Sequence, residues 1–401
     1  MGKKLVFVGG GHAHLTSLKN ISNFRKLGHQ VTLISPSPYH YYSGMGPGML
    51  SEIYHPWEVR FHIRKLAEGQ GAAFIQGKVE RIDPETHNLF LDSGERVYYD
   101  VVSFNTGSEV PTESLAATAH DNLFPVKPVM NLVKARHSIL GAIRANRSLR
   151  IVVVGGGPAG VEISANLLRL LHENQGKGEI TLIAGKRLLG DAPDEVRRLA
   201  TASLAGRGVV IIEGSYVKSV EKGSVTLSDG NRYDPSTAID PALETRQKSP
   251  LRIDFDFAFI AIGITPSSLF RDSGVPTGAD GGLLVNWFLQ SVTHPDIFGG
   301  GDCISLEGHP LPKVGVHAVR QNPVLHRNLL AALEGGKMEA FQPQEYFLLI
   351  FNMGNGKGIF WKKNWVWEGR LALLLKDYID RRFMKTFQVS GELNERSDGV
   401  E

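Results

Sequence analysis

The amino-acid sequence predicts an α/β protein with two Rossmann-like dinucleotide-binding domains, antiparallel β-meander insertions and a C-terminal α+β extension. Three observations predict this fold. A strand, a glycine turn, a helix and a second strand occur over residues 4–34 and again over residues 150–183. The two turns begin 146 residues apart, too far for a solenoid repeat and suitable for two nucleotide-binding domains. Short strand runs separated by turns follow each unit.

The composition excludes several other classes. A length of 401 residues suggests two to three domains, and a net charge of +3 is too small to indicate a nucleic-acid partner. No apolar run is long enough for a transmembrane helix, and the N-terminal run is too short for a signal peptide, so we expect a cytoplasmic protein. Cys303 is the single cysteine, which excludes an intramolecular disulfide and leaves too few thiolates for a zinc or iron–sulfur site. We expect no metal.

The first unit carries a glycine turn that is one residue short of the dinucleotide fingerprint. In that fingerprint, glycines let the backbone turn tightly and approach a pyrophosphate at a helix N-terminus. His14 replaces the third glycine, and Ser35 stands where an acidic residue would meet the ribose. We expect a nucleotide here, and a purely structural turn is the alternative. The unit comprises strand 4–8, the turn Gly9, Gly10 and Gly11, a helix from His12 and Ala13 to about Lys26, and strand 30–34.

The second unit carries the complete fingerprint, and we expect a dinucleotide there as well. No acidic residue follows its second strand. The basic pair Lys186 and Arg187 follows instead and suits the 2′-phosphate of NADPH, although a solvated loop explains the pair equally well. The unit comprises strand 150–154, the turn Gly155, Gly156, Gly157, Pro158, Ala159 and Gly160, helix 161–172 and strand 179–183.

Strand runs and composition shifts predict the domain boundaries. Residues 233–252, rich in Pro, Asp and Ser, indicate a flexible loop, and the composition becomes aromatic and basic after Lys337. The expected meander strands are 73–75, 79–83 and 89–91 in the first half and 209–212, 217–220 and 225–227 in the second, with a buried strand over 257–262. The expected domains are 1–112 with 256–337 for the first nucleotide, 113–255 for the second, and 338–401 as an interface or membrane-surface domain.

Taken together, the motifs resemble the two-dinucleotide-fold flavoproteins of the pyridine nucleotide-disulfide oxidoreductase superfamily. The resemblance covers nearly the whole chain and rests on the two glycine turns, Asn105-Thr106-Gly107, Ala261-Ile262-Gly263 and Gly301-Asp302-Cys303. Within the superfamily, residues 9–14, 42–48 and 126–128 look most like NADH-dehydrogenase-like proteins. Type II NADH dehydrogenases and sulfide:quinone reductases are the close relatives.

The resemblance implies FAD on the first turn and NAD(P)H on the second. Asp302 would hold the ribityl chain, although on its chemistry alone a plain β-turn explains that segment. Glu162 would lie near the nicotinamide and acceptor, its alternative being a helix N-terminal acid. Lys376 resembles a lysine near the quinone tunnel of type II dehydrogenases. The other expected cofactor contacts are Gly9, Gly10, Gly11, His12, Ala13, Ser35, Val79, Asn105, Thr106, Gly107, Gly155, Gly157, Pro158, Ala159, Gly160, Lys186, Arg187, Gly263, Gly301 and Ala318.

A single cysteine narrows the expected mechanism. Disulfide reductases and sulfide:quinone reductases both need more than one cysteine. The remaining route takes hydride from NAD(P)H to the flavin and then electrons to a second, quinone-like acceptor. The alternatives are a soluble electron-transfer reductase with a protein or dye-like oxidant, and a slow-turnover flavin- or nucleotide-binding sensor.

The C-terminal region is basic and aromatic. Residues 357–385 contain eight Lys and Arg against three acidic residues, a local net charge of +5, and the stretch holds three tryptophans. Such a segment suits an anionic bilayer surface, so we expect 357–387 to dock on the inner face of the cell membrane. A core-packing or homodimer helix is the alternative, because Arg382 falls on the apolar face. We also expect a homodimer. The apolar face of this predicted helix comprises Leu371, Leu374, Leu375, Tyr378 and Ile379.

Overall fold

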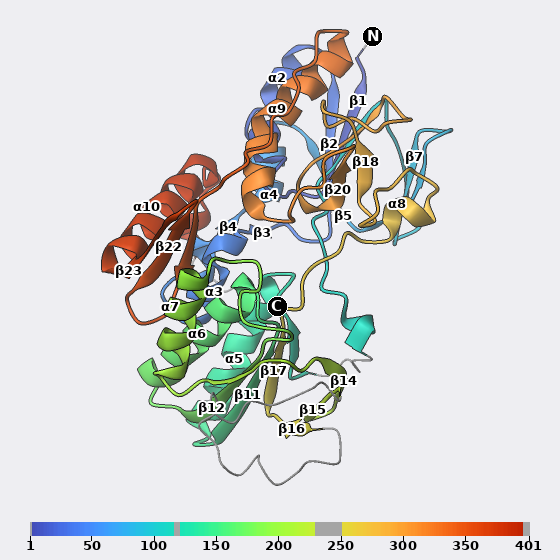
Figure 1. The fold of residues 1–401 in the computed structure, drawn as a ribbon. Coiled ribbons are helices and arrows are strands. Elements are labelled where there is room, and N and C mark those ends of the chain that lie inside the picture. Colours follow the sequence, from blue (N-terminus) through green and yellow to red (C-terminus); the bar gives the residue numbers. More distant parts are fainter. Residues whose placement is uncertain (1, 116–120, 229–250, 396–401) are drawn as a thin grey trace.

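The computed structural model describes residues 2–115, 121–228 and 251–395 and consists of two α/β halves with a smaller unit packed beside both (Figure 1). A five-stranded sheet forms the centre of each half. The loop expected over residues 233–252 lies mostly outside the described residues. We find no helix in the described part of the chain that is both long and apolar enough to span a bilayer.

The first sheet lies in the upper half of Figure 1 and is parallel throughout, in the order β19-β9-β1-β2-β5. Its strands are β1 Lys4–Val8, β2 Gln30–Ser35, β5 Ala73–Gln76, β9 Val101–Phe104 and β19 Ile297–Gly299. Strands covered on both faces are near-continuous apolar runs, as β1 is after its exposed first residue, Lys4. The helix expected up to Lys26 is broken at Asn20 into α1 (Leu15–Lys19) and α2 (Ile21–Lys26), because the backbone of Asn20 leaves the helical region.

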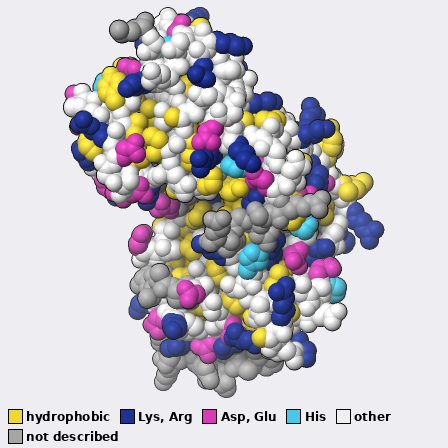
Figure 2. Space-filling model, turned by 180° about the vertical axis from the view of Figure 1, so that it is seen from behind, with side chains coloured by type: hydrophobic (Ala, Val, Ile, Leu, Met, Phe, Trp, Pro, Cys, Tyr) yellow, Lys and Arg dark blue, Asp and Glu magenta, His cyan; other side chains and the backbone are white. Residues whose placement is uncertain are grey.

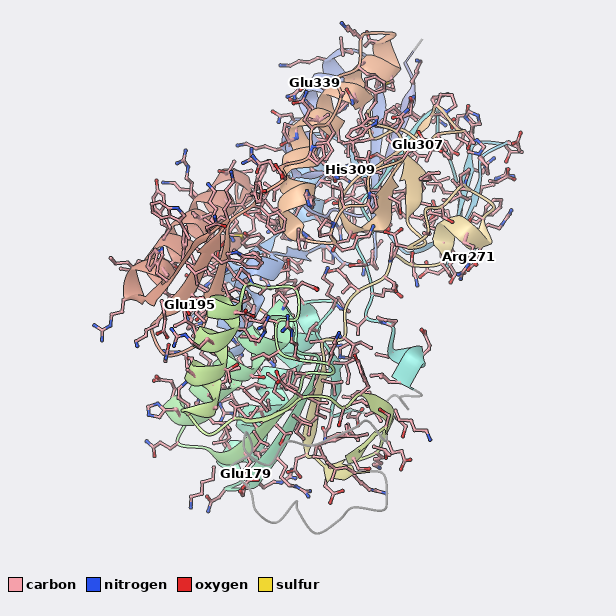
Figure 3. The ribbon with its side chains drawn as sticks, in the orientation of Figure 1. Glu179, Glu195, Arg271, Glu307, His309 and Glu339 are labelled. Atoms are coloured by element: carbon pink, nitrogen blue, oxygen red, sulfur yellow. The ribbon has the colours of Figure 1, made fainter. Side chains whose placement is uncertain are left out.

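The second sheet has the order β10-β17-β11-β12-β13 and is also parallel. Its strands are β10 Leu123–Pro125, β11 Ser148–Val154, β12 Lys177–Ile183, β13 Val210–Ile212 and β17 Phe257–Ile260, and its helices are α5 Met130–Arg144, α6 Pro158–Glu173 and α7 Asp194–Ala205. Because β17 pairs in this sheet, the chain returns to the first half after residue 260 rather than at residue 255. Glu179 and Glu195 lie on the outside of this half (Figure 3).

Each half also carries an antiparallel three-stranded sheet, as predicted. The runs at 73–75 and 209–212 are corrected, because they pair in the parallel sheets as β5 and β13 instead. The two meanders are β6 Val79–Asp83, β7 Asn88–Leu91 and β8 Arg96–Tyr98, and β14 Val217–Glu221, β15 Ser224–Leu227 and β16 Arg252–Asp254. The remaining elements of the two halves are β3 His40–Tyr41, α3 Gly46–Leu50, β4 Arg60–Phe61, α4 Ile63–Glu68, α8 Leu269–Asp272, β18 Leu283–Val285, β20 Ile304–Leu306 and α9 Gly315–Glu334.

The C-terminal unit is the predicted α+β extension. The strands β21 (Leu349–Asn352), β22 (Gly358–Lys362) and β23 (Trp365–Gly369) form an antiparallel sheet against which α10 (Arg370–Phe387) packs. Strand β21 contacts α6 of the lower half, and α10 contacts α1 and β4 of the upper half. The unit therefore bridges the two halves.

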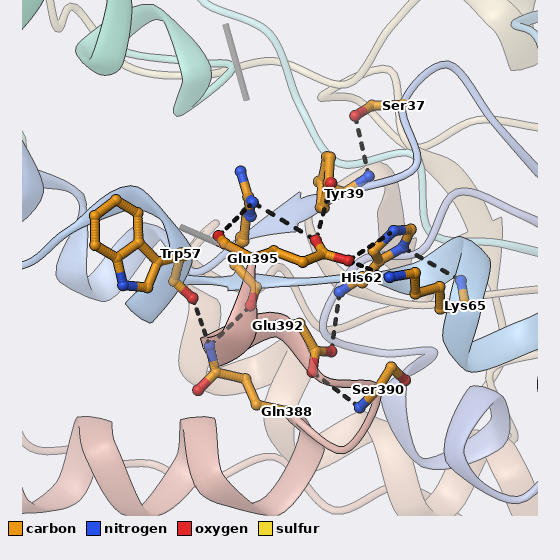
Figure 4. A network of polar contacts seen from close by, with 10 residues as sticks. Ser37, Tyr39, Trp57, His62, Lys65, Gln388, Ser390, Glu392 and Glu395 are labelled. Carbon is orange, nitrogen blue, oxygen red and sulfur yellow. Dashed lines mark hydrogen bonds and ion pairs between the residues drawn. The ribbon is translucent and has the colours of Figure 1, made fainter. Parts of the chain in front are cut away.

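The chain after α10 is tied to the upper half by a polar network (Figure 4). Gln388 Nε2 donates to the carbonyls of Trp57, Glu58 and Arg60. Glu392 accepts from the backbone N–H of His62 at 3.0 Å, and Glu395 pairs with Lys65. These contacts join positions more than 300 residues apart in the sequence. They connect the segment after α10 to the upper half and thereby hold α10 against it.

His14 shows how the first half tolerates the missing third glycine. Its ring is fully buried and lies between the turn and β9. Nδ1 donates to the Gly9 carbonyl at 2.6 Å, and Nε2 accepts from the Ser103 hydroxyl at 2.8 Å. Burial lowers the pKa of His14 to about 4, which keeps the ring neutral in this arrangement. The side chain therefore joins the helix to the strand across the space that a glycine would leave for direct backbone contact.

Replacing His14 by alanine removes this cross-link. We expect His14→Ala to lower the free energy of unfolding by about 2 kcal/mol, because it leaves the buried Ser103 hydroxyl and the partly buried Gly9 carbonyl unpaired. Urea unfolding at pH 7 measures the loss. The control is His172→Ala, whose side chain is 89% exposed and whose effect should stay within about 0.5 kcal/mol. Equal stability of the two variants would contradict this role.

Candidate active site

One cavity joins the two glycine turns. It has a volume of about 1270 Å³, more than the roughly 300–1,000 Å³ of a typical small-molecule site. Hydrophobic side chains also gather along the waist between the halves on the rear face (Figure 2). The predicted residues that line the cavity are Gly9, Gly10, Gly11, His12, Ser35, Val79, Asn105, Thr106, Gly107, Gly155, Gly157, Pro158, Ala159, Gly263, Asp302 and Ala318.

The first turn is shaped by Asn105, which follows β9. Gly9 has φ +83°, and a Cβ there would collide with the Asn105 carbonyl. The Asn105 side chain accepts from the Ala13 N–H at 3.0 Å and donates to the Gly300 carbonyl at 2.6 Å. Asn105 therefore holds three backbone segments together. Ala13 is fully buried and does not line the cavity, so it packs rather than contacts a ligand.

The second turn leads into α6 in the same way. Gly155 has φ +121° and lies against the Ala261 carbonyl, and Gly160 lies against the carbonyl of Gly155. A Cβ on Gly157, by contrast, would meet no atom within 4 Å, because this residue faces the cavity. Both turns thus place backbone amides beside open space, an arrangement that fits the pyrophosphate of a dinucleotide.

Asp302, which lines the cavity, forms an ion pair with Lys127. Its Oδ2 accepts from Lys127 Nζ at 2.6 Å and from the Ser108 hydroxyl at 3.0 Å. Sequence reasoning noted residues 126–128 as a motif but missed this ion pair, because the partners lie 175 residues apart. Gly301 does not line the cavity, and its N–H donates to the Gln321 side chain instead.

His12 and His40 form a buried pair beside the first turn. Nδ1 of His12 lies 3.3 Å from Nε2 of His40, and burial, with Lys127 as a smaller cause, lowers the pKa of His12 to about 4. The other nitrogen of His12, Nε2, is buried without a partner among the described residues. Since His12 lines the cavity, this orphaned nitrogen fits a ligand that supplies a hydrogen bond.

Seven predicted residues do not line the cavity: Ala13, Gly160, Gly301, Lys186, Arg187, Glu162 and Lys376. Lys186 and Arg187 are exposed next to it, and Arg187 donates to the Gly190 carbonyl of its own loop. Sequence reasoning missed Tyr216, whose ring lines the cavity nearby and is 58% exposed. Glu162 and Lys376 lie behind the wall and belong to one polar cluster.

That cluster joins α6, α10 and the segment before α3. Glu162 Oε1 accepts from the Asn352 N–H at 2.7 Å, and burial raises its pKa. Lys376 Nζ donates to the Gly44 carbonyl at 2.8 Å and to Asp380 at 3.0 Å. Burial opposes the charge of Lys376, but Asp380 and Glu162 outweigh it and raise the lysine pKa. The structure therefore brings the two predicted catalytic residues into one buried charge system.

Cys303 is a structural residue. It is fully buried, and its Sγ donates to the carbonyls of Gly300 at 3.3 Å and Phe104 at 3.5 Å. Burial raises the pKa of the thiol, so it is a poor nucleophile. Among the described residues no group of His, Cys, Asp and Glu is arranged to hold a metal ion.

Comparison with known proteins agrees with this geometry. The family model of pyridine nucleotide-disulphide oxidoreductases matches residues 3–322. The chain belongs to this family. The predicted family, fold class, enzyme class and cofactors, FAD and NAD(P)H, are confirmed.

Three relatives illustrate the match. A ferroptosis suppressor protein 1 from Taeniopygia guttata is 28% identical over 324 residues, which are 80% of this chain and 80% of the relative. The demethylphylloquinone reductase NdbB from a Synechocystis strain is 25% identical over 344 residues, 83% of this chain and 80% of the relative. The structure of NDH2 from Plasmodium falciparum in complex with NADH shares the fold, with a TM-score of 0.78, 15% identity and coverage of 100% of both chains.

The contact between Gly160 and Gly155 gives a test of the nicotinamide site. If the second turn holds the pyrophosphate, Gly160→Ala should raise the NAD(P)H concentration for half-maximal flavin reduction about tenfold or more, because its Cβ displaces that turn. Anaerobic bleaching of the flavin against nicotinamide concentration measures this, and the FAD content should stay unchanged.

Gly141→Ala is the matched control. Gly141 is exposed in α5, and a Cβ there meets nothing within 4 Å. If both variants bind NAD(P)H like the original protein, the second turn is not the nicotinamide site.

Proposed function

We propose that this protein is an FAD-dependent NAD(P)H dehydrogenase that reduces a quinone-like acceptor without a redox disulfide. The observation that carries the proposal is the single cavity that both glycine turns line. A nicotinamide on the second turn and a flavin on the first would share one cavity, as hydride transfer requires. Cys303 is the one cysteine and is buried, which leaves no thiol pair to act as an intermediate carrier.

The chain's own groups have distinct roles in this proposal. FAD, when bound, takes two electrons from the nicotinamide and passes them on. The backbone amides of the two turns bind the pyrophosphates, and Asp302 holds the ribityl chain. Lys127 beside Asp302 balances its charge. Glu162 and Lys376 lie behind the cavity wall, where they support an acceptor that approaches from the side of α10. A quinone agrees with the name of one relative, the demethylphylloquinone reductase.

The first test separates the electron acceptors. The purified protein should be yellow, and anaerobic NADH or NADPH should bleach the flavin within the mixing time of a stopped-flow instrument. A water-soluble quinone should then restore the colour at a rate that supports turnover, at about 1 s⁻¹ or faster. Comparing the two nicotinamides decides which donor is used.

Other outcomes favour the alternative functions. If quinone does not reoxidise the bleached flavin but a one-electron dye does, the protein is a reductase for another acceptor. If NADH and NADPH bleach the flavin only over many minutes, the protein is a flavin- or nucleotide-binding sensor and the proposal is wrong.

We also propose that α10 docks on an anionic membrane surface. Helix α10 buries Ala372, Asp380, Met384 and Phe387, so its predicted apolar face is turned to solvent. On that face Leu371 is 72% exposed, Leu374 63% and Tyr378 61%. Five cations of the same unit are exposed and make no ion pair within the described residues, which favours anionic headgroups as the occupant. They are Lys362, Lys363, Arg370, Arg382 and Lys385.

A charge placed on this face should abolish the docking. Leu374→Asp should remove co-sedimentation with vesicles that contain phosphatidylglycerol, while activity with a water-soluble quinone is kept. The control is Leu27→Asp, which changes a leucine that is 49% exposed in the upper half. If the variant binds vesicles as before, the proposal is wrong. If the original protein is a dimer and only Leu374→Asp makes it monomeric, the face is a homodimer interface instead.

A further inference from the structure

Asp380 occupies the centre of the polar cluster, although sequence reasoning did not select it. It lies one helical turn after Lys376 on α10, and residues four apart face the same side of a helix. Its side chain is only 6% exposed. A carboxylate at this depth is costly unless both oxygens are engaged. This residue therefore has a role that the surface acids of α10 do not share.

Both oxygens of Asp380 are engaged by groups from different segments. Oδ2 accepts from Lys376 Nζ at 3.0 Å, and Oδ1 accepts from the Tyr42 hydroxyl at 2.9 Å. Tyr42 belongs to the upper half, and burial together with Asp380 raises its pKa well above the usual value, so its hydroxyl remains a donor. The carboxylate is thus fixed in place from two sides.

Lys376 is held by this carboxylate and by one backbone carbonyl. Its ammonium group has three N–H donors, of which one goes to Asp380 and one to the Gly44 carbonyl. Within the described residues no third hydrogen bond is made. The Lys376 side chain is 13% exposed, and one N–H of its ammonium group remains for a ligand.

The charges around Lys376 come from two elements. Glu162 faces it from α6, and Asp380 and Asp377 lie on α10 itself. Asp377 is directed elsewhere, because it accepts from Arg381 at 3.0 Å and from the Tyr54 hydroxyl at 2.8 Å. Asp380 is the carboxylate in hydrogen-bond contact with the ammonium.

We propose that Asp380 is a positioning residue that fixes the Lys376 ammonium so that its remaining N–H stabilises the negative charge developing on the acceptor oxygen. This inference rests on the proposed reduction of a quinone-like acceptor. A preorganised cationic donor is most effective where charge develops in the transition state, and holding it in advance avoids reorganisation during the reaction. Tyr42 serves the same purpose one contact further away, by orienting the carboxylate.

The decisive variant is Asp380→Asn, which keeps the shape and the Tyr42 contact but removes the charge. With a water-soluble quinone, kcat should fall about tenfold at neutral pH because the lysine is no longer held. The high-pH limb of the kcat profile should move to lower pH by about one unit or more, because a buried lysine without its carboxylate loses its proton more easily. The rate at which NAD(P)H bleaches the flavin, the FAD content and the quinone KM should change little.

Two further variants make the test specific. Asp377→Asn removes a carboxylate from the same helix that makes no hydrogen bond to Lys376, and it should move the high-pH limb much less than Asp380→Asn does. Asp380→Glu keeps the charge but moves it by one methylene, so kcat should fall while the high-pH limb stays in place. This second variant carries the test if Asp380→Asn does not fold.

The possible failures are distinguishable. If Asp380→Asn or Asp380→Glu has the kcat and pH profile of the original protein, Asp380 is not a positioning residue. If Lys376→Met reduces quinone normally, the inference is overturned while the proposed function stands. If quinone does not reoxidise the flavin of the unaltered protein, both are overturned.

Discussion

The structure depends on the close approach of backbone at the carboxyl ends of neighbouring parallel strands. Gly9 lies against the Asn105 carbonyl between β1 and β9, and Gly155 lies against the Ala261 carbonyl between β11 and β17. Both residues have positive φ, and a Cβ at either position would collide with the carbonyl. Because the chain turns away from the sheet at these points, backbone amides face open space, and a cavity of about 1270 Å³ extends between them.

The two halves meet the same packing requirement by different means. In the second half Gly160 lets α6 approach the turn directly. In the first half the His14 ring occupies the equivalent space and replaces backbone contact with hydrogen bonds to Gly9 and Ser103. A buried neutral imidazole can do this because it has one donor and one acceptor on opposite sides. The departure from the fingerprint therefore changes how the turn is supported without removing the cavity beside it.

The C-terminal unit adds a polar cluster from outside the two nucleotide folds. It inserts Lys376 behind the second turn, near Glu162 of α6, and the network at the end of the chain holds α10 in that position. The buried face of α10 carries the carboxylate of Asp380 among apolar residues, and the solvent face exposes leucines that an ordinary surface helix would bury. One helix thus carries the cluster on one face and the proposed membrane contact on the other.

The sequence by itself determined the fold class, the two nucleotide turns and the absence of a disulfide route. The fold class and the turns depend on local backbone conformations that glycine adopts without strain. The absence of a disulfide route depends on the number of cysteines, which is one. The tertiary structure alone decided that Lys127 pairs with Asp302, that Asp380 joins Tyr42 to Lys376, and which face of α10 is buried. These contacts join positions 175 and 338 residues apart, and hydrophobic periodicity cannot tell which side of an amphipathic helix meets a neighbour. Tertiary packing decides which face of a helix is buried, because it determines which neighbouring element that face contacts.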